Sequence, residues 1–277
     1  MPVFDLLTQN AQIALRTPAQ WESCVRTLVA QGLAGFVYAR RAEMLPSDIR
    51  AQLHKVYLAQ FAFNANLETN YRRVRGALEN VGCEPVLLKG LSLLGRVYDA
   101  GERPISDIDV LIRPNQLELS STVLRELGYR SKTELRWHAN DFKRNFEDES
   151  GLCEVELHTR LFYNEPASFE WGTQYDAERG RHLSDEHMLA HLLGHLGFQH
   201  TFLKLFWLVD VDLLARAYGS RLDWELLARS LARLRLTRSA ALVLGACRRY
   251  LNTPGLEPIL GRLPVTPEWV WQRVLTP

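Results

Sequence analysis

Two carboxylates placed two positions apart, Asp107 and Asp109, interrupt an apolar stretch at residues 105–112. The stretch predicts a strand, and because strand side chains alternate between faces, both aspartates lie on one face. Neighbouring carboxylates repel each other, whereas a divalent cation such as Mg²⁺ binds carboxylate and phosphate oxygens together. The pair therefore indicates a metal site for phosphate chemistry, although so short a motif also suits a turn residue followed by a solvated edge residue.

A lysine and a glycine that precede a predicted helix favour the metal-site interpretation. Lys89-Gly90 follows the apolar run at 86–88, which predicts a buried strand, and leads into a short helix predicted at 91–98. A glycine at such a turn lets backbone N–H groups approach an anion, and a helix N-terminus favours negative charge. A phosphate-binding turn followed by a metal-binding pair on the next strand would form one coherent site.

A third acidic position is expected in a strand predicted at residues 152–159. Glu154, Glu156 and His158 share one face of that strand, and apolar side chains occupy the other face. A single polar face is also the ordinary pattern of an antiparallel strand beside solvent. The residues alone therefore leave the functional and the structural interpretation open.

Three histidines, His187, His191 and His195, recur at intervals of four residues and share one face of a predicted helix. His191 and His195 have the spacing found in zinc proteases, but Leu192 stands where those enzymes carry their general-base glutamate. We therefore predict a structural role for these histidines.

Several of these residues occur together in one known family. The chain resembles the uncharacterised nucleotidyltransferase family of the DNA-polymerase-β-like superfamily over residues 50–250. The positions that carry the resemblance are Leu88-Lys89-Gly90, Tyr98, Arg103, Asp107-Ile108-Asp109-Val110-Leu111, Val155-Glu156-Leu157-His158, Lys204 and Leu208-Val209-Asp210. The resemblance implies an α+β fold, with a mixed-sheet core of polymerase-β type, an N-terminal helical region and a C-terminal helical bundle.

The resemblance also implies an activity, the transfer of a nucleoside monophosphate from an NTP to a hydroxyl group with release of pyrophosphate. Asp107, Asp109 and Glu156 would then be the catalytic metal ligands for Mg²⁺ or Mn²⁺, with Glu154 as the alternative third carboxylate. Glu156 could also accept the proton of the attacking hydroxyl.

The nucleotide-binding residues that the resemblance implies are Lys89, Gly90, Ser92, Arg103 and Lys204. The superfamily usually follows its phosphate-turn glycine with Gly or Ser, whereas here Leu91 follows Gly90 and the serine comes one residue later. The expected partners are an NTP and a hydroxyl-bearing acceptor, which is a small molecule, a peptide or protein, or a tRNA end. Two other hypotheses stay open: an inactive nucleotide- or partner-binding module, and a two-metal phosphodiesterase or nuclease.

The hydrophobic pattern predicts three consecutive regions, a helical region at 1–80, an α/β core at 81–165 and a helical domain at 166–277. Within the first region, the absence of Gly and Pro between Ser47 and Gly76 predicts one long helix. The core is expected to contain a helix at 117–127 that ends at Gly128. Two further strands are expected at 129–137 and 141–147.

Composition limits the class of protein further. A hydrophobic fraction of 47% and a net charge of +1 are ordinary for a globular chain of 277 residues and provide no global basic field for nucleic acid. The four cysteines are dispersed and lack C-x-x-C spacing, which indicates reduced thiols without a disulfide-linked partner. Signal-peptide and membrane-spanning patterns are lacking, so we expect a cytoplasmic protein without a membrane partner.

Overall fold

The computed structural model describes residues 3–8, 17–132 and 142–274 of the chain. The chain folds into two compact units. The helical unit contains Met1–Ala62, Val97–Pro104 and Asp185–Pro277, and the sheet unit contains Phe63–Arg96 and Ile105–Ser184. The expected division into three domains at residues 80 and 165 stays a prediction.

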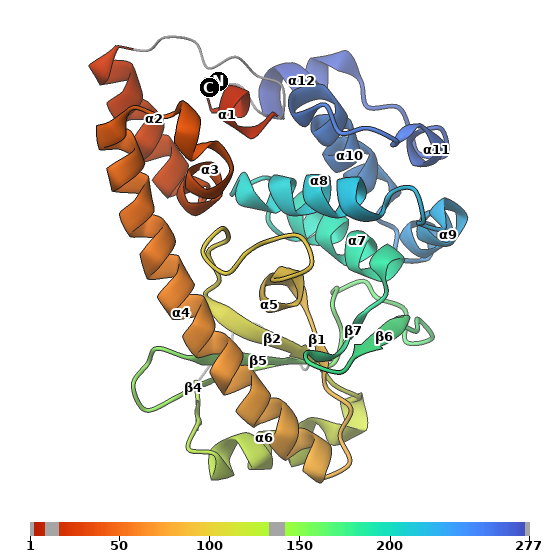
Figure 1. Cartoon of the computed structure of the whole chain (residues 1–277). Coiled ribbons are helices and arrows are strands. Elements are labelled where there is room, and N and C mark those ends of the chain that lie inside the picture. The colour runs from red at the N-terminus through yellow and green to blue at the C-terminus, as the bar shows by residue number, and fades with distance from the viewer. Residues whose placement is uncertain (1–2, 9–16, 133–141, 275–277) are drawn as a thin grey trace. The chain divides into compact units, whose positions relative to one another are not determined.

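Helix α4 (Ser47–Asn80) contributes residues to both units (Figure 1). It starts at Ser47 as predicted and continues past Gly76, because a glycine inside a helix costs only about 1 kcal/mol relative to alanine. The chain leaves the helix at Gly82, which has a φ of 79° and so adopts the left-handed conformation that glycine tolerates best.

The sheet unit is built on seven strands in the order β3-β4-β5-β2-β1-β7-β6. Strands β1 and β7 are parallel, as are β2 and β5, and the other neighbours are antiparallel, so the sheet is mixed. The α+β fold expected from the sequence is therefore confirmed. The strands are β1 (Val86–Leu87), β2 (Asp107–Leu111), β3 (Arg130–Ser131), β4 (Lys143–Glu147), β5 (Glu154–His158), β6 (Thr173–Asp176) and β7 (Gly180–Leu183).

The two central strands, β2 and β5, have one polar and one apolar face. Ile108 and Val110 alternate with the aspartates of β2, and Val155 and Leu157 alternate with the glutamates of β5; all four apolar side chains are fully buried. Helix α6 (Leu117–Glu126) packs against β5 on the apolar side, where Arg144 donates to Ser121. Gly128, with a φ of 90°, follows that helix as predicted. Burial of the apolar face thus leaves the polar face for the site.

Short connecting elements complete the sheet unit. Helix α5 (Lys89–Leu93) follows β1, and a 3-10 turn, η2 (Pro114–Gln116), leads into α6. The hairpin of β6 and β7 was not predicted, and β7 extends the sheet by pairing in parallel with β1. Residues 133–141, where we expected the end of one strand and the start of the next, lie outside the described part of the chain.

The helical unit contains the N-terminal and C-terminal helices (Figure 1). Helix α2 (Pro18–Ala30) begins with a capping box formed by Thr17 and Gln20, and Pro18 occupies its first turn. The other elements are α1 (Phe4–Leu7), α3 (Ala34–Arg41), η1 (Ala42–Met44), α7 (Asp185–Gly194), the π-helix η3 (His195–Gln199), α8 (Phe206–Tyr218), α9 (Trp224–Arg233), α10 (Thr237–Leu251), α11 (Glu257–Leu260) and α12 (Glu268–Val274).

Two further features concern the cysteines and the hydrophobicity of the helices. The four cysteines are free and buried, so none of them forms a disulfide within the chain. Among residues 3–8, 17–132 and 142–274, no helix combines the length and the apolar character needed to cross a lipid bilayer.

Candidate functional site

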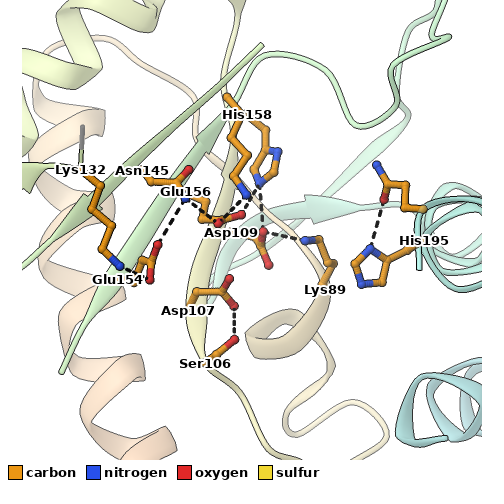
Figure 2. A network of polar contacts seen from close by, with 12 residues as sticks. Lys89, Ser106, Asp107, Asp109, Lys132, Asn145, Glu154, Glu156, His158 and His195 are labelled. Carbon is orange, nitrogen blue, oxygen red and sulfur yellow. Dashed lines mark hydrogen bonds and ion pairs between the residues drawn. The ribbon is translucent and has the colours of Figure 1, made fainter. Parts of the chain in front are cut away.

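The candidate site lies on the polar face of strands β2 and β5 in the sheet unit (Figure 2). Asp107 and Asp109 alternate with buried residues along β2, so both project from one face, as the strand period requires. The parallel register places Asp107 opposite Glu154 and Asp109 opposite Glu156. Strand pairing therefore brings together carboxylates that lie nearly fifty positions apart in the sequence.

A compact group of ligand atoms forms around Asp109. Carboxylate oxygens of Asp109 and Glu156 and a ring nitrogen of His158 all lie within 4.8 Å of one another, and the three side chains are buried. His158 Nε2 is 2.9 Å from Asp109 Oδ1 and 3.3 Å from Glu156 Oε2. Two carboxylates and one imidazole in such a group form a donor set that suits a divalent cation.

Asp107 is the first residue of strand β2 and is less buried than Asp109. Its Oδ1 accepts a hydrogen bond of 2.9 Å from the exposed hydroxyl of Ser106. Asp107 shares the polar face of the sheet with the buried group.

Lys89 reaches the same group from the turn after β1. Its Nζ lies 2.7 Å from Asp109 Oδ1, so two nitrogens, from Lys89 and His158, contact one carboxylate oxygen. Lys89 has a φ of 36°, which a non-glycine residue rarely adopts and which marks local strain in the backbone. With the backbone in this conformation, the ammonium group of Lys89 contacts Asp109. Gly90 follows in helix α5, and the Ser92 hydroxyl donates to the Lys89 carbonyl at 2.7 Å.

The two glutamates of β5 have different surroundings. Glu156 is 2.5 Å from Lys143 Nζ and accepts a hydrogen bond of 3.1 Å from Asn145, in addition to its contact with His158. Glu154 pairs with Lys132 at 2.7 Å, and its side chain is 28% exposed, compared with 9% for Glu156. Only Glu156 of the two belongs to the compact group of ligand atoms, so the geometry favours it as the third carboxylate.

The carboxylates differ in how readily they take a proton. Burial, followed by the charges of Asp109 and Glu156, raises the pKa of Asp107 to about 6. Burial acts in the same direction on Asp109, but Lys89 and His158 outweigh it and hold the pKa of Asp109 well below its ordinary value. The hydrogen bond from His158 likewise outweighs burial and lowers the pKa of Glu156. Near neutral pH all three are ionised, and Asp107 is the first to be protonated on acidification.

The raised pKa of Asp107 predicts a pH-dependent effect of Asp107→Asn on stability. A carboxyl that binds its proton more tightly in the folded state destabilises that state as the pH rises from about 4 through about 6. In EDTA at pH 8, the variant should exceed wild type in free energy of unfolding by about 1–2 kcal/mol. At pH 4 the difference should vanish, because Asp107 is then neutral. Urea unfolding at both values measures the effect, and an equal difference at pH 4 and pH 8 would contradict it.

Two residues predicted to bind the nucleotide, Arg103 and Lys204, belong to the helical unit. Arg103 makes a bidentate contact with the buried Asp210, from Nε at 2.9 Å and from Nη2 at 2.8 Å. Tyr98 donates to the same carboxylate at 2.8 Å, and Lys204 donates to the Ala30 carbonyl at 2.6 Å. These contacts stabilise the helical unit, and a role of either cation in nucleotide binding stays a prediction.

The histidines of helix α7 also lie within the helical unit. His187 Nε2 is 3.2 Å from the Ser230 hydroxyl, and His195 Nδ1 is 3.2 Å from Gln199 Oε1. The ring of His195 also contacts the ring of Trp207, with centroids 4.9 Å apart. All three helix histidines, including His191, are buried, which agrees with packing inside the unit.

His158 is the residue of the group that sequence reasoning did not assign to the site. It was placed on the same strand face as Glu156, and that shared face was the signal that could have identified it. What the sequence did not contain was the register of β5 on β2, which brings the imidazole to Asp109.

The chain was also compared with known proteins. A family model described as "Uncharacterised nucleotidyltransferase" matches residues 17–252. No curated protein matches the chain. Among solved structures, the chain is similar to an antigenic nucleotidyltransferase-like protein from Paracoccidioides brasiliensis, with 12% identity and a TM-score of 0.40 over 76% of this chain and 97% of that chain. The family match confirms the resemblance predicted from the sequence.

Proposed function

Because the chain belongs to the uncharacterised nucleotidyltransferase family, we propose that it is an enzyme that transfers a nucleoside monophosphate from an NTP to a hydroxyl group. The observation that carries this proposal is the convergence of Asp107 and Asp109 on β2 with Glu156 on β5, on one face of the sheet. Three carboxylates beside a lysine form a site for cations and phosphate oxygens, as nucleotidyl transfer requires.

The residues present fit a divalent cation. Asp107, Asp109 and Glu156 would hold it, and His158 adds a nitrogen donor that Mn²⁺ accepts more readily than Mg²⁺ does. When bound, the cation would supply Lewis-acid stabilisation of the negative charge that develops on the phosphate oxygens.

The protein's own groups have distinct roles in the proposed reaction. The acceptor oxygen forms a bond to the α-phosphorus, the bond from phosphorus to the bridging oxygen breaks, and pyrophosphate leaves. Glu156, with its lowered pKa, is ionised near neutral pH and accepts the hydroxyl proton directly or through water. Lys89 supplies positive charge for the triphosphate, and Gly90 and Ser92 shape the turn that presents it.

The test of the proposal is transfer of label from NTPs labelled at the α-phosphate. Purified wild-type protein would be incubated with each NTP, Mg²⁺ or Mn²⁺, and a cell extract separated into small molecules, proteins and RNA. We expect cation-dependent label in one fraction, with release of an equal amount of pyrophosphate. The proposal fails if no fraction is labelled and calorimetry detects no binding of any NTP in the presence of the cation.

Replacing His158 is expected to weaken the binding of a cation. Because its imidazole contacts both Asp109 and Glu156, His158→Ala removes a donor and loosens two carboxylates, and the Kd for Mn²⁺ should rise about 10–100-fold. Calorimetric titration with Mn²⁺ measures this without any turnover. His182, a buried histidine of the same unit whose Nδ1 lies 2.9 Å from the Leu183 carbonyl, provides the control variant His182→Ala. Equal Kd values for wild type and His158→Ala would show that His158 is not a ligand.

A further inference from the structure

A second feature of the sheet unit is a pocket of about 650 Å³. Its lining includes Val86 of β1, Leu111 of β2 and the following residue Ile112, and the aromatic residues Phe169 and Trp171. The rings of those two residues meet at 66° with centroids 4.8 Å apart. The volume falls in the range of pockets that enclose most of a small organic ligand, about 300–1,000 Å³.

The pocket adjoins the carboxylate site along the strands. Leu111 follows Asp109 by two residues and therefore lies on the same face, roughly 7 Å further along β2. Leu111 pairs directly with His158 on β5, and Thr159, the next residue after β5, lines the pocket. The pocket thus begins at the end of the strands where His158 stands. Asp109 and Glu156 lie opposite each other two residues back along β2 and β5, and Asp107 lies at the far end of β2.

The polar lining of the pocket contains both charges in equal number. Three arginines and three glutamates contribute, and one glutamate, Glu84, forms ion pairs with both Arg113 and Arg181. Buried Glu165 accepts a hydrogen bond of 2.8 Å from the Leu161 backbone. The members of the charged lining are Arg113, Arg160, Arg181, Glu84, Glu165 and Glu170.

We propose that this pocket binds the acceptor of the transfer reaction and that the acceptor is a saccharide. The proposal rests on the proposed function, and it selects a small molecule from among the acceptor classes that present a hydroxyl. The reacting hydroxyl would extend from the pocket toward Glu156, which accepts its proton.

The lining favours a sugar on chemical grounds. Each sugar hydroxyl both donates and accepts hydrogen bonds, so one ligand satisfies arginine donors and glutamate acceptors alike. The apolar face of a pyranose ring can pack on Trp171, which presents a large aromatic surface. A polynucleotide needs an excess of positive charge, which this lining lacks. An apolar ligand would leave the ion pairs of Glu84 desolvated without new partners.

The test is a direct measurement of saccharide binding to the full-length protein, without nucleotide. A panel of pyranose monosaccharides and their disaccharides would be screened by saturation-transfer NMR, and each hit titrated by calorimetry. Ala167 lines the pocket and is exposed, so Ala167→Trp fills the space with little strain on folding. Ala177 is exposed in the turn after β6 and does not line the pocket, so Ala177→Trp makes the same chemical change elsewhere in the unit.

At least one saccharide should bind wild type, with a Kd that rises about tenfold or more in Ala167→Trp and stays within about twofold in Ala177→Trp. With labelled NTP, the KM for that saccharide should rise in the same way in Ala167→Trp. The proposal is overturned if no saccharide binds, or if Ala167→Trp binds as wild type does. It is also overturned if a single-stranded RNA or a serine-containing peptide is labelled equally by wild type and Ala167→Trp. Saccharide binding with no transfer of label, together with no binding of any NTP in calorimetry, would instead reject the proposed function.

Discussion

Asp109→Asn is expected to lower the rate of nucleotidyl transfer by about 10³-fold or more, a loss of about 4 kcal/mol in transition-state stabilisation. Asp109 is the centre of the buried group, since Lys89 and His158 both contact its Oδ1 and Glu156 is its strand partner. The substitution keeps the shape of the side chain but removes the charge that attracts a divalent cation. The measurement is the initial rate of label transfer at saturating NTP and cation.

The matched control for Asp109→Asn is Glu154→Gln. Glu154 is also a carboxylate on the polar face of the sheet, but it is ion-paired with Lys132 outside the compact group of ligand atoms. The rate of label transfer by Glu154→Gln should differ from that of wild type by no more than about threefold, because an exposed ion pair contributes little. Thermal unfolding of both variants would establish that they are folded. A rate for Asp109→Asn within tenfold of wild type would exclude Asp109 as the central ligand.

The largest loss of stability is expected in the helical unit, from Asp210→Asn. Asp210 is fully buried, and its two oxygens accept hydrogen bonds from the guanidinium of Arg103 and the hydroxyl of Tyr98. Asparagine keeps an acceptor for Tyr98 but leaves the positive charge of Arg103 buried without a counter-charge. Such a change costs about 3–5 kcal/mol in free energy of unfolding, measured by urea denaturation.

A double variant separates loss of the ion pair from loss of packing. Arg103→Met added to Asp210→Asn removes the uncompensated charge and should recover about half or more of the lost stability. In contrast, the ion pair of Arg221 with Asp185 has an arginine side chain that is 65% exposed. Arg221→Ala should therefore cost no more than about 1 kcal/mol. If the double variant is as unstable as Asp210→Asn alone, the buried charge is not the cause.

The partner of Arg103 is a feature that the sequence does not determine. The sequence predicts a nucleotide-binding role for Arg103 because it is one of the residues that carry the family resemblance. Its partner in the structure, Asp210, lies 107 positions away in the chain. A side chain's partner across such a separation depends on how helices pack, and no local pattern contains that information.

The sequence by itself determined the features that depend on neighbouring residues. The period of a strand placed Asp107 and Asp109 on one face, and Gly128 ended helix α6, because both effects act within a few residues. The family followed from short motifs in the same way. The hairpin of β6 and β7 was not predicted, since its strands have four residues each and only β7 joins the sheet, by pairing with the distant β1.

Only the tertiary structure decided how the site is assembled. The register of β5 on β2 places Glu156, and not Glu154, in the compact group of ligand atoms and brings His158 to Asp109, although all three residues of β5 share one strand face. The strained backbone of Lys89 directed its ammonium group at the same carboxylate. The pocket beside the site combines residues from β1, β2, β7 and the segment after β5. Contacts between strands far apart in the chain form only when the whole sheet closes, which is why the sequence identified the carboxylates but not their partners.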